Sequence, residues 1–209
     1  MTAASLEGLV SRYLNRRLSR PLARLLAPTP VTPNQVSVLS LVVAFAAFAA
    51  FGLDQAIAAG LLIQASSVID GVDGDLARRQ GRASRFGAVF DAFLDRVADA
   101  AVVGGMAWWA WEHPERAGPE PFVVGLATLT AFLMVSYSRA RMEAEGYREL
   151  LAGPALLASR DVRLLLAAVG SAVGQAYWTL VVLGAMSAAS LVWRLVLVYR
   201  APAASGAKA

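Results

Sequence analysis

Four aspartates in this sequence form two closely spaced pairs. Asp70 and Asp73 are three residues apart, and Asp91 and Asp95 are four residues apart. On a helix, both spacings place the two carboxylates of a pair on one face. Four carboxylates brought together repel one another, and bound divalent cations would offset that repulsion. Because an all-oxygen ligand set suits Mg²⁺ or Mn²⁺, the pattern predicts a centre that binds one or two such ions.

Glycines and arginines lie close to these aspartates in the sequence. Glycine inside a helix costs about 1 kcal/mol relative to alanine, so its repeated use here predicts that a bulky ligand approaches the backbone. Arginine side chains add donors for phosphate oxygens. Together, the carboxylates, glycines and arginines predict a site for a nucleotide diphosphate. The glycines are Gly71, Gly74 and Gly87, and the arginines are Arg78, Arg82 and Arg85.

The residues alone leave two other roles open for the aspartates. Each carboxylate could form a structural ion pair with a nearby arginine, Arg78 or Arg96. Intramembrane carboxylates also form the cation and proton pathways of transporters. The alternative function is therefore a small membrane transporter that uses these aspartates for cation coupling. Flux of a substrate into liposomes without bond cleavage would favour the transporter over an enzyme.

The composition is that of a membrane protein. Of the 209 residues, 57% are hydrophobic and 16% are charged, whereas soluble domains carry about a quarter charged residues. There is no cysteine, which excludes disulfides, thiolate catalysis and cysteine-based zinc sites. The net charge of +4 comes from arginines grouped near the ends of apolar segments. It therefore indicates contact with membrane lipids and no nucleic-acid partner.

The apolar segments predict an all-α integral membrane fold with six transmembrane helices. Each crossing needs about 20 apolar residues, and a chain of this length can supply six. The first aspartate pair lies near the end of the second predicted span, and the second pair lies in the first half of the third. Because a short arginine-rich turn joins these spans, we expect antiparallel neighbours with all four carboxylates at similar depth. The predicted spans cover residues 36–52, 55–79, 84–111, 122–141, 162–173 and 177–198.

An N-terminal amphipathic helix is predicted before the first span, over residues 6–26. Leucines such as Leu14 and Leu18 recur at helical spacing, with arginines such as Arg16 and Arg20 between them. This pattern is typical of a helix that lies in the membrane interface near anionic headgroups, although a solvated helix packed on the protein would share it. The predicted parts of the chain are residues 1–30 (interfacial helix and Pro-rich link), 31–200 (catalytic domain) and 201–209 (flexible tail).

The arginines also predict how the protein is oriented in the membrane. Most of them precede the first span or lie in two of the loops, whereas the opposite loops contain only Arg116. By the positive-inside rule, both termini and the aspartates face the cytoplasm, in the inner (plasma) membrane. The tryptophans within residues 108–111 would then lie at the far interface. Gly170 and Gly174 form a small-xxx-small pair that could support a homodimer or a contact within the chain.

The segment from Asp70 to Asp95 resembles the signature of the CDP-alcohol phosphotransferase family. That signature is DxxDGxxAR, eight further residues and GxxxDxxxD, and every fixed position is matched here. In that family, an acceptor hydroxyl attacks the β-phosphorus of a CDP-linked alcohol, and CMP leaves. The resemblance thus implies a transferase with six spans and a preceding interfacial helix. The matched residues are Asp70, Asp73, Gly74, Ala77, Arg78, Gly87, Asp91 and Asp95.

The resemblance also implies a role for individual residues. Asp70, Asp73 and Asp91 would be metal ligands. Asp95 would bind the second metal ion and act as the general base. The residues implied to contact the CDP moiety are Pro33, Asn34, Gly74, Arg78 and Ser84.

Two aspartates near the signature are not part of it. We expect Asp75 to face the headgroup region of the membrane. Asp99 lies one turn beyond Asp95, and we expect it to pair locally with Arg96 or another neighbour. Neither is predicted to take part in the chemistry.

A second resemblance concerns the acceptor. Residues 136–141, with the sequence SYSRAR, resemble a segment of the phosphatidylinositol-phosphate synthases, in which a lysine stands in place of Arg139. In those enzymes this segment and a later arginine bind the phosphate of inositol phosphate. Arginine keeps the charge of lysine but changes the geometry, and the positive-inside rule alone would also account for arginines here. The residues implied to bind the acceptor are Ser136, Arg139, Arg160 and Arg163.

The N-terminal part resembles another branch of the family. Residues 11–17 and 32–37 are similar to the membrane domain of di-myo-inositol phosphate phosphate synthases, which join CDP-inositol to inositol phosphate. The two branches share the acceptor and differ in the donor. We therefore predict an inositol phosphate acceptor, with CDP-inositol and CDP-diacylglycerol as alternative donors. Glycerol phosphate, serine and free inositol are further acceptors that the sequence leaves open.

Overall fold

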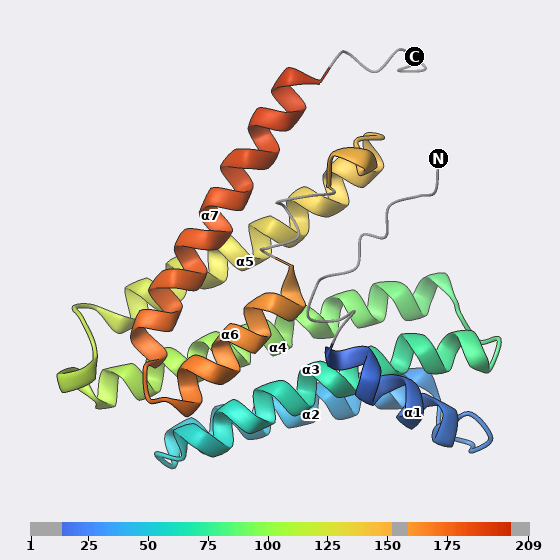
Figure 1. The fold of residues 1–209 in the computed structure, drawn as a ribbon, viewed down its shortest axis with the longest axis horizontal. Coiled ribbons are helices and arrows are strands. Elements are labelled where there is room, and N and C mark those ends of the chain that lie inside the picture. The colour runs from blue at the N-terminus through green and yellow to red at the C-terminus, as the bar shows by residue number, and fades with distance from the viewer. Residues whose placement is uncertain (1–13, 152–158, 202–209) are drawn as a thin grey trace.

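The computed structural model describes residues 14–151 and 159–201. Over this part the chain forms seven α-helices and two short 3₁₀ helices, with no strand (Figure 1). All six helices predicted as spans are present, and their ends lie within three residues of the predicted ones. The elements are α1 (Arg16–Leu26), α2 (Pro33–Gly52), α3 (Ala56–Arg79), α4 (Arg85–Glu112), η2 (Pro114–Arg116), α5 (Pro121–Ala144), η3 (Arg148–Leu151), α6 (Arg160–Ala172) and α7 (Ala176–Arg200).

Side-chain caps start the two helices that border the site. The Thr32 hydroxyl accepts a hydrogen bond from the Gln35 backbone N–H, and the Gln35 side chain accepts one from the Thr32 backbone N–H. Pro33 occupies the first turn of α2, where its missing N–H costs nothing. Ser84 caps α4 by accepting a hydrogen bond from the Gly87 backbone N–H at 3.0 Å. The residues around both caps therefore have a defined backbone geometry.

The helices pack as two groups (Figure 1). In the described part of the chain, the larger of two clusters of buried apolar side chains joins the groups, and a smaller one lies between α1, α2 and α3. In the first group, α2 packs on α3 and α4, and α3 also contacts α6. In the second group, α5 pairs with α7, and α4 contacts both of these helices. Phe51, Ile63, Met106 and Leu180 come from both groups and are fully buried in the larger cluster. This cluster therefore holds α3 and α4, which carry the four aspartates, in a fixed relation to α6.

Glycines allow α6 to approach its neighbours closely. A Cβ atom on Gly60 of α3 would collide with the carbonyl oxygen of Ala168 in α6. A Cβ atom on Gly170 would collide with the side chain of Thr179 in α7. Gly170 therefore serves a contact within the chain, which is one of the two roles predicted for it. Gly174 lies beyond the end of α6 with a positive φ of 69°, a conformation that glycine adopts without strain.

Four of the described helices, α2, α3, α5 and α7, are long and apolar enough to cross a membrane. Large apolar side chains such as Phe45, Leu126 and Leu195 are exposed on the outside of these helices, as expected for contact with lipid. The other two predicted spans differ from these four. α4 has 28 residues but carries several charged residues, and α6 has 13 residues. The fold is thus an all-helical membrane type in which composition and length identify four of the six predicted spans.

Helix α1 lies against α3 at the same end of the bundle as the turn between α3 and α4 (Figure 1). Its Ser19 and Ala23 are buried, while Leu18, Leu22 and Leu25 are exposed. One face therefore packs on the protein, and a leucine row on the other face lacks an apolar partner within the described part of the chain. The predicted helix began at residue 6, and its first residues lie outside the described part.

Candidate active site

The turn between α3 and α4 brings the two aspartate pairs together, as predicted. One carboxylate oxygen from each of Asp70, Asp91 and Asp95 lies within 4.8 Å of the other two. All three side chains are partly buried. Because α3 and α4 are antiparallel and the turn is short, residues on both sides of it reach the same depth. The structure thus forms a three-carboxylate cluster from residues that are up to 25 positions apart in the sequence.

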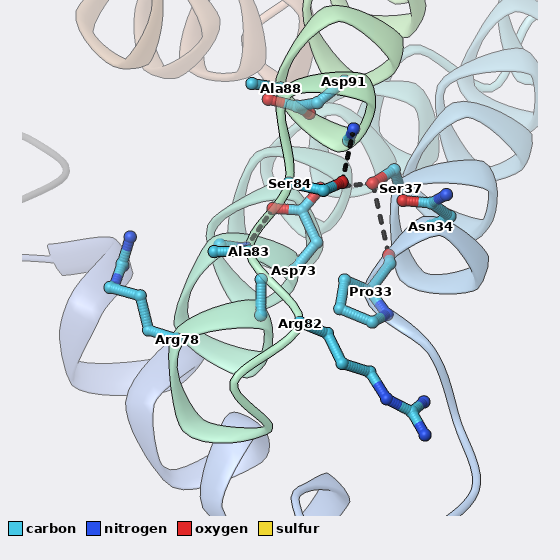
Figure 2. Close-up of a pocket in the computed structure, with 13 residues that line it drawn as sticks. Pro33, Asn34, Ser37, Asp73, Arg78, Arg82, Ala83, Ser84, Ala88 and Asp91 are labelled. Atoms are coloured by element: carbon cyan, nitrogen blue, oxygen red, sulfur yellow. Dashed lines mark hydrogen bonds between the residues drawn. The ribbon is translucent and has the colours of Figure 1, made fainter.

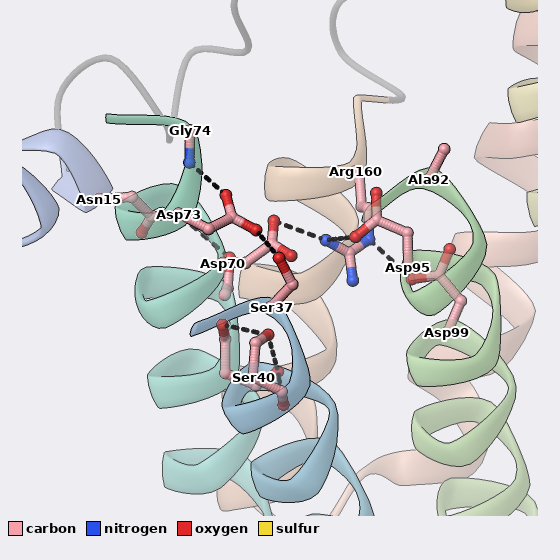
Figure 3. A network of polar contacts seen from close by, with 12 residues as sticks. Asn15, Ser37, Ser40, Asp70, Asp73, Gly74, Ala92, Asp95, Asp99 and Arg160 are labelled. Carbon is pink, nitrogen blue, oxygen red and sulfur yellow. Dashed lines mark hydrogen bonds and ion pairs between the residues drawn. The ribbon is translucent and has the colours of Figure 1, made fainter. Parts of the chain in front are cut away.

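Asp73 is the fourth aspartate and is held separately by α2 (Figure 3). Its carboxylate accepts a hydrogen bond from the Ser37 hydroxyl at 2.5 Å and another from the Gly74 backbone N–H. It is buried and shares a cavity wall with Asp91. Ser37 was not among the predicted site residues, and its position one turn after the α2 cap is the signal that would have suggested it.

Arg160, at the start of α6, lies among the carboxylates (Figure 3). Its Nη1 atom is 2.9 Å from Asp70 Oδ2 and 2.8 Å from Asp95 Oδ1, and its Nε donates to Asp99 Oδ1 at 3.0 Å. The guanidinium therefore offsets the repulsion between the carboxylates in this structure. We predicted Arg160 as an acceptor ligand, and the structure places it on two of the predicted metal ligands. Of the structural ion pairs considered from the sequence, the one between Asp95 and Arg96 is present, at 3.1 Å.

The expectations for the two aspartates outside the signature are wrong. Asp99 does not pair with Arg96; it is 1% exposed and contacts Arg160 and, at 3.9 Å, Arg163. It faces α6, so its partners come from about 60 residues further along the chain. Asp75 does not face the headgroup region, because α1 covers it. It accepts hydrogen bonds from Ser19 of α1 and from Arg78.

A cavity of about 230 Å³ opens beside the aspartates, between α2, α3 and the start of α4 (Figure 2). All five residues predicted to contact the CDP moiety line it, and Asp73 and Asp91 line it too. The cavity therefore joins the predicted nucleotide site to the predicted metal centre. Its lining residues are Pro33, Asn34, Ser37, Asp73, Gly74, Ala77, Arg78, Arg82, Ala83, Ser84, Gly87, Ala88 and Asp91.

Two glycines line this cavity without adding a side chain to it. A Cβ atom on Gly87 would lie 3.2 Å from the Ser84 hydroxyl and 3.6 Å from Asn34 Oδ1. A Cβ atom on Gly74 would lie 3.6 Å from the Arg78 guanidinium. Side chains at these positions would occupy space between residues of the cavity wall. This agrees with the prediction that glycines near the aspartates leave room for a ligand.

The residues predicted to bind the acceptor lie in different surroundings. Ser136 is partly buried on α5. Arg139, on the same helix, is about half exposed and pairs with Glu143 at 3.1 Å. The buried Arg163 stacks its guanidinium on Phe132, 4.0 Å from the ring centre. These residues and Arg160, which lies on the aspartates, therefore have different partners.

Arg194 of α7 is a buried basic residue that the sequence analysis missed. It donates hydrogen bonds to the Val135 carbonyl at 2.6 Å and to the Ser138 hydroxyl at 2.8 Å. It thereby joins α7 to the segment predicted to bind the acceptor. The signal was present, because Arg194 is the only charged residue of α7 before its last turn, which contains Arg200. A buried charge in a membrane span has a partner or a function.

The carboxylate cluster fits a divalent ion. Asp95 Oδ1 is buried and accepts no hydrogen bond of normal geometry, although Arg160 is close enough for an ion pair. The described ligand set consists of hard carboxylate oxygens, without sulfur or imidazole. Such a set suits Mg²⁺ or Mn²⁺, and a divalent ion could take the place that the guanidinium now holds.

Comparisons with known proteins agree with this geometry. The bifunctional IPC transferase and DIPP synthase of Rubrobacter xylanophilus is 39% identical over 198 residues, which are 95% of this chain and 44% of that protein. This chain thus spans less than half the length of that relative. The phosphatidylinositol phosphate synthase of Mycobacterium tuberculosis is 33% identical over 166 residues, which are 78% of this chain and 73% of that protein.

Crystal structures of the mycobacterial enzyme have the same fold. The structure with CDP-DAG bound aligns with a TM-score of 0.76 and 30% identity, covering 92% of this chain and 99% of that one. The structure in complex with manganese and citrate aligns with a TM-score of 0.75 and 28% identity, covering 91% and 93% of the two chains. The sequence model of the CDP-alcohol phosphatidyltransferase family matches residues 30–186. The chain therefore belongs to the CDP-alcohol phosphatidyltransferase family.

Proposed function

We propose that this protein transfers a substituted phosphoryl group from a CDP-alcohol to an acceptor hydroxyl and releases CMP. The observation that carries the proposal is the cluster of Asp70, Asp91 and Asp95, of which Asp91, together with Asp73, also lines the cavity formed by the five predicted CDP contacts. Asp70, Asp73, Asp91 and Asp95 would hold two divalent ions, Mg²⁺ or Mn²⁺. Membership of a transferase family argues against the alternative of a transporter.

In the proposed reaction, each polar group of the site has a task. When bound, the ions would neutralise the diphosphate and stabilise the departing CMP oxygen. Asp95 would take the proton of the acceptor hydroxyl. The hydroxyl oxygen would form a bond to the β-phosphorus, and the bond from that phosphorus to the CMP oxygen would break. Ser37 would fix the Asp73 carboxylate, while Arg78 would bind the diphosphate.

For the substrates, we propose an inositol phosphate acceptor. The mycobacterial relative is named a phosphatidylinositol phosphate synthase, and the sequence resemblances described above imply the same acceptor. CDP-inositol and CDP-diacylglycerol are both candidate donors. Ser136, Arg139 and Arg163 would bind the acceptor phosphate, with the buried Arg194 supporting the segment around Ser136. Arg160 would join them once cations have replaced it on the aspartates.

In the membrane, we propose six spans, with α4 and α6 added to the four helices of clear apolar character. Residues 31–200 would form the catalytic domain, and residues 201–209 a flexible tail. Residues 1–30 would contribute an interfacial helix whose exposed leucines enter the lipid while its arginines meet anionic headgroups. Both termini and the active site would be cytoplasmic, in the inner (plasma) membrane. A homodimer would be the working assembly.

A panel of donors and acceptors tests the function directly. Purified protein in detergent is given Mg²⁺ or Mn²⁺ and either CDP-diacylglycerol or CDP-inositol. Each donor is combined with inositol phosphate, inositol, glycerol phosphate or serine, and CMP is measured. We expect CMP only with a matching acceptor, and inositol phosphate to be the best one. Absence of CMP from every pair would refute the proposed function.

A further inference from the structure

Asp75 is a buried carboxylate that the proposed reaction does not use. Its side chain is 11% exposed, and both of its carboxylate oxygens have partners. Arg78 Nη2 donates to Asp75 Oδ1 at 2.6 Å, and the Ser19 hydroxyl of α1 lies 3.4 Å from Asp75 Oδ2. Burying a carboxylate is unfavourable unless it is paired. The role of Asp75 therefore depends on its two partners, Arg78 and Ser19.

Arg78, the main partner of Asp75, stands between two cavities. It lines the nucleotide cavity and also a smaller cavity of about 160 Å³ between α1 and α3. The smaller cavity reaches the carboxylates of Asp70 and Asp73. The Arg78 guanidinium folds back over Gly74, the glycine that both cavities share. A diphosphate that extends from the nucleotide cavity to the metal centre would pass this guanidinium.

We infer that Asp75 is a positioning residue for the donor, because it holds the Arg78 guanidinium beside Gly74. The Arg78 side chain is 62% exposed, so without a partner it would sample many rotamers and would lose that freedom on binding a ligand. Asp75 is set by burial under α1 and by Ser19, and its charge-assisted hydrogen bond restricts the guanidinium before the donor arrives. The covering helix α1 thus contributes to donor binding without touching the nucleotide cavity.

This inference rests on the proposed function, because it assumes a CDP-alcohol donor. The test therefore begins with the donor that gives CMP with the wild-type protein, and compares donor KM and kcat for variants. We expect Asp75→Asn to raise the donor KM about tenfold, the equivalent of about 1.4 kcal/mol, with a much smaller change in kcat. Asp75→Glu keeps the charge and should give an intermediate KM. Ser19→Ala should raise the KM about twofold.

A double-variant comparison separates positioning from a general effect on folding. In an Arg78→Gln background, Asp75→Asn should add no further increase in donor KM, because its partner is already gone. Glu145→Gln is the matched control: Glu145 also pairs with an arginine, Arg141, at 2.7 Å, but on the exposed surface. It should leave both constants unchanged. Thermal unfolding of each variant is measured alongside the kinetics.

Three results would overturn the inference while the wild-type protein remains active. They are an unchanged donor KM in Asp75→Asn, an equal effect of that change with and without Arg78, and a fall in kcat with no change in KM. Absence of CMP from the wild-type protein would instead refute the proposed function. The two failures are therefore distinct.

Discussion

The residues proposed to bind the donor and those proposed to bind the acceptor differ in how closely they lie together. On the donor side, residues from α2, α3 and the start of α4 line one cavity. On the acceptor side, Arg160 and Arg163 are occupied by aspartate and aromatic partners, and Arg139 pairs with Glu143 at the surface. The proposed donor residues Gly74, Arg78 and Ser84 lie around one short turn, and the packing of α2 on α3 and α4 adds Pro33 and Asn34. The acceptor residues belong to two helices, and their alignment depends on packing and on what binds to them.

The largest expected effect is on the proposed chemical step, in which the acceptor hydroxyl attacks the donor phosphorus. Asp95→Asn removes the proposed base, so kcat should fall by about 10²–10⁴-fold, the usual contribution of a positioned base. Donor binding should fall far less, because Asp70, Asp73, Asp91 and the nucleotide cavity remain. The turnover rate is measured by CMP release, and donor binding is measured by calorimetry. Normal activity in this variant would contradict the assignment of Asp95 as the base.

If the cavity binds the donor, a side chain that fills part of the cavity should weaken donor binding. Gly87→Val would place methyl groups between Ser84 and Asn34, where even a Cβ atom lies 3.2 Å from the Ser84 hydroxyl. We expect the donor KM to rise about tenfold with little change in the acceptor KM. Gly52→Val is the control, because a Cβ atom on Gly52 has no neighbour within 4 Å. Equal donor KM values for the two variants would mean that the cavity beside Gly87 does not bind the donor.

The residues predicted to bind the donor lie together in the structure, and part of the reason is local. Helical spacing and a short turn are local features, and they bring Asp70 and Asp91 together. The Thr32 cap fixes the backbone around Pro33 and Asn34, but these residues reach the cavity beside Asp91 because α2 packs on α3 and α4.

Contacts between distant helices could not be predicted in the same way. Asp99 meets Arg160 from 61 residues away, and Asp75 meets Ser19 from 56 residues away. Both contacts depend on how α6 and α1 are rotated about their axes when they pack on the bundle. Two residues that the sequence could have indicated were not predicted. Arg194 is the only charged residue of α7 before its last turn, and Ser37 lies one turn into α2.

Among the proposed acceptor residues, Arg160 should compete with a divalent metal ion for the carboxylates of Asp70 and Asp95. Arg160→Met removes the cation that now lies within 3 Å of Asp70 and Asp95. The carboxylates would keep their full negative charge, so Mn²⁺ should bind about fivefold more tightly in the absence of substrates. Electron paramagnetic resonance of free Mn²⁺ measures this, with Arg141→Met as a control that removes an exposed arginine away from the aspartates. Unchanged or weaker Mn²⁺ binding in Arg160→Met would contradict the competition.

The smallest expected effect tests whether the acceptor side is as loosely organised as the comparison implies. Arg139→Gln removes a half-exposed charge whose partner, Glu143, is also accessible. An exposed charge contributes about 0.2–1 kcal/mol, so the acceptor KM should rise by about fivefold at most, with the donor KM unchanged. Glu143→Gln is the complementary variant: it releases Arg139 from its ion pair and should lower the acceptor KM slightly. An increase of a hundredfold in Arg139→Gln would mean that Arg139 lies in an acceptor pocket as well assembled as the donor cavity, and the contrast between the two sides would then be lost.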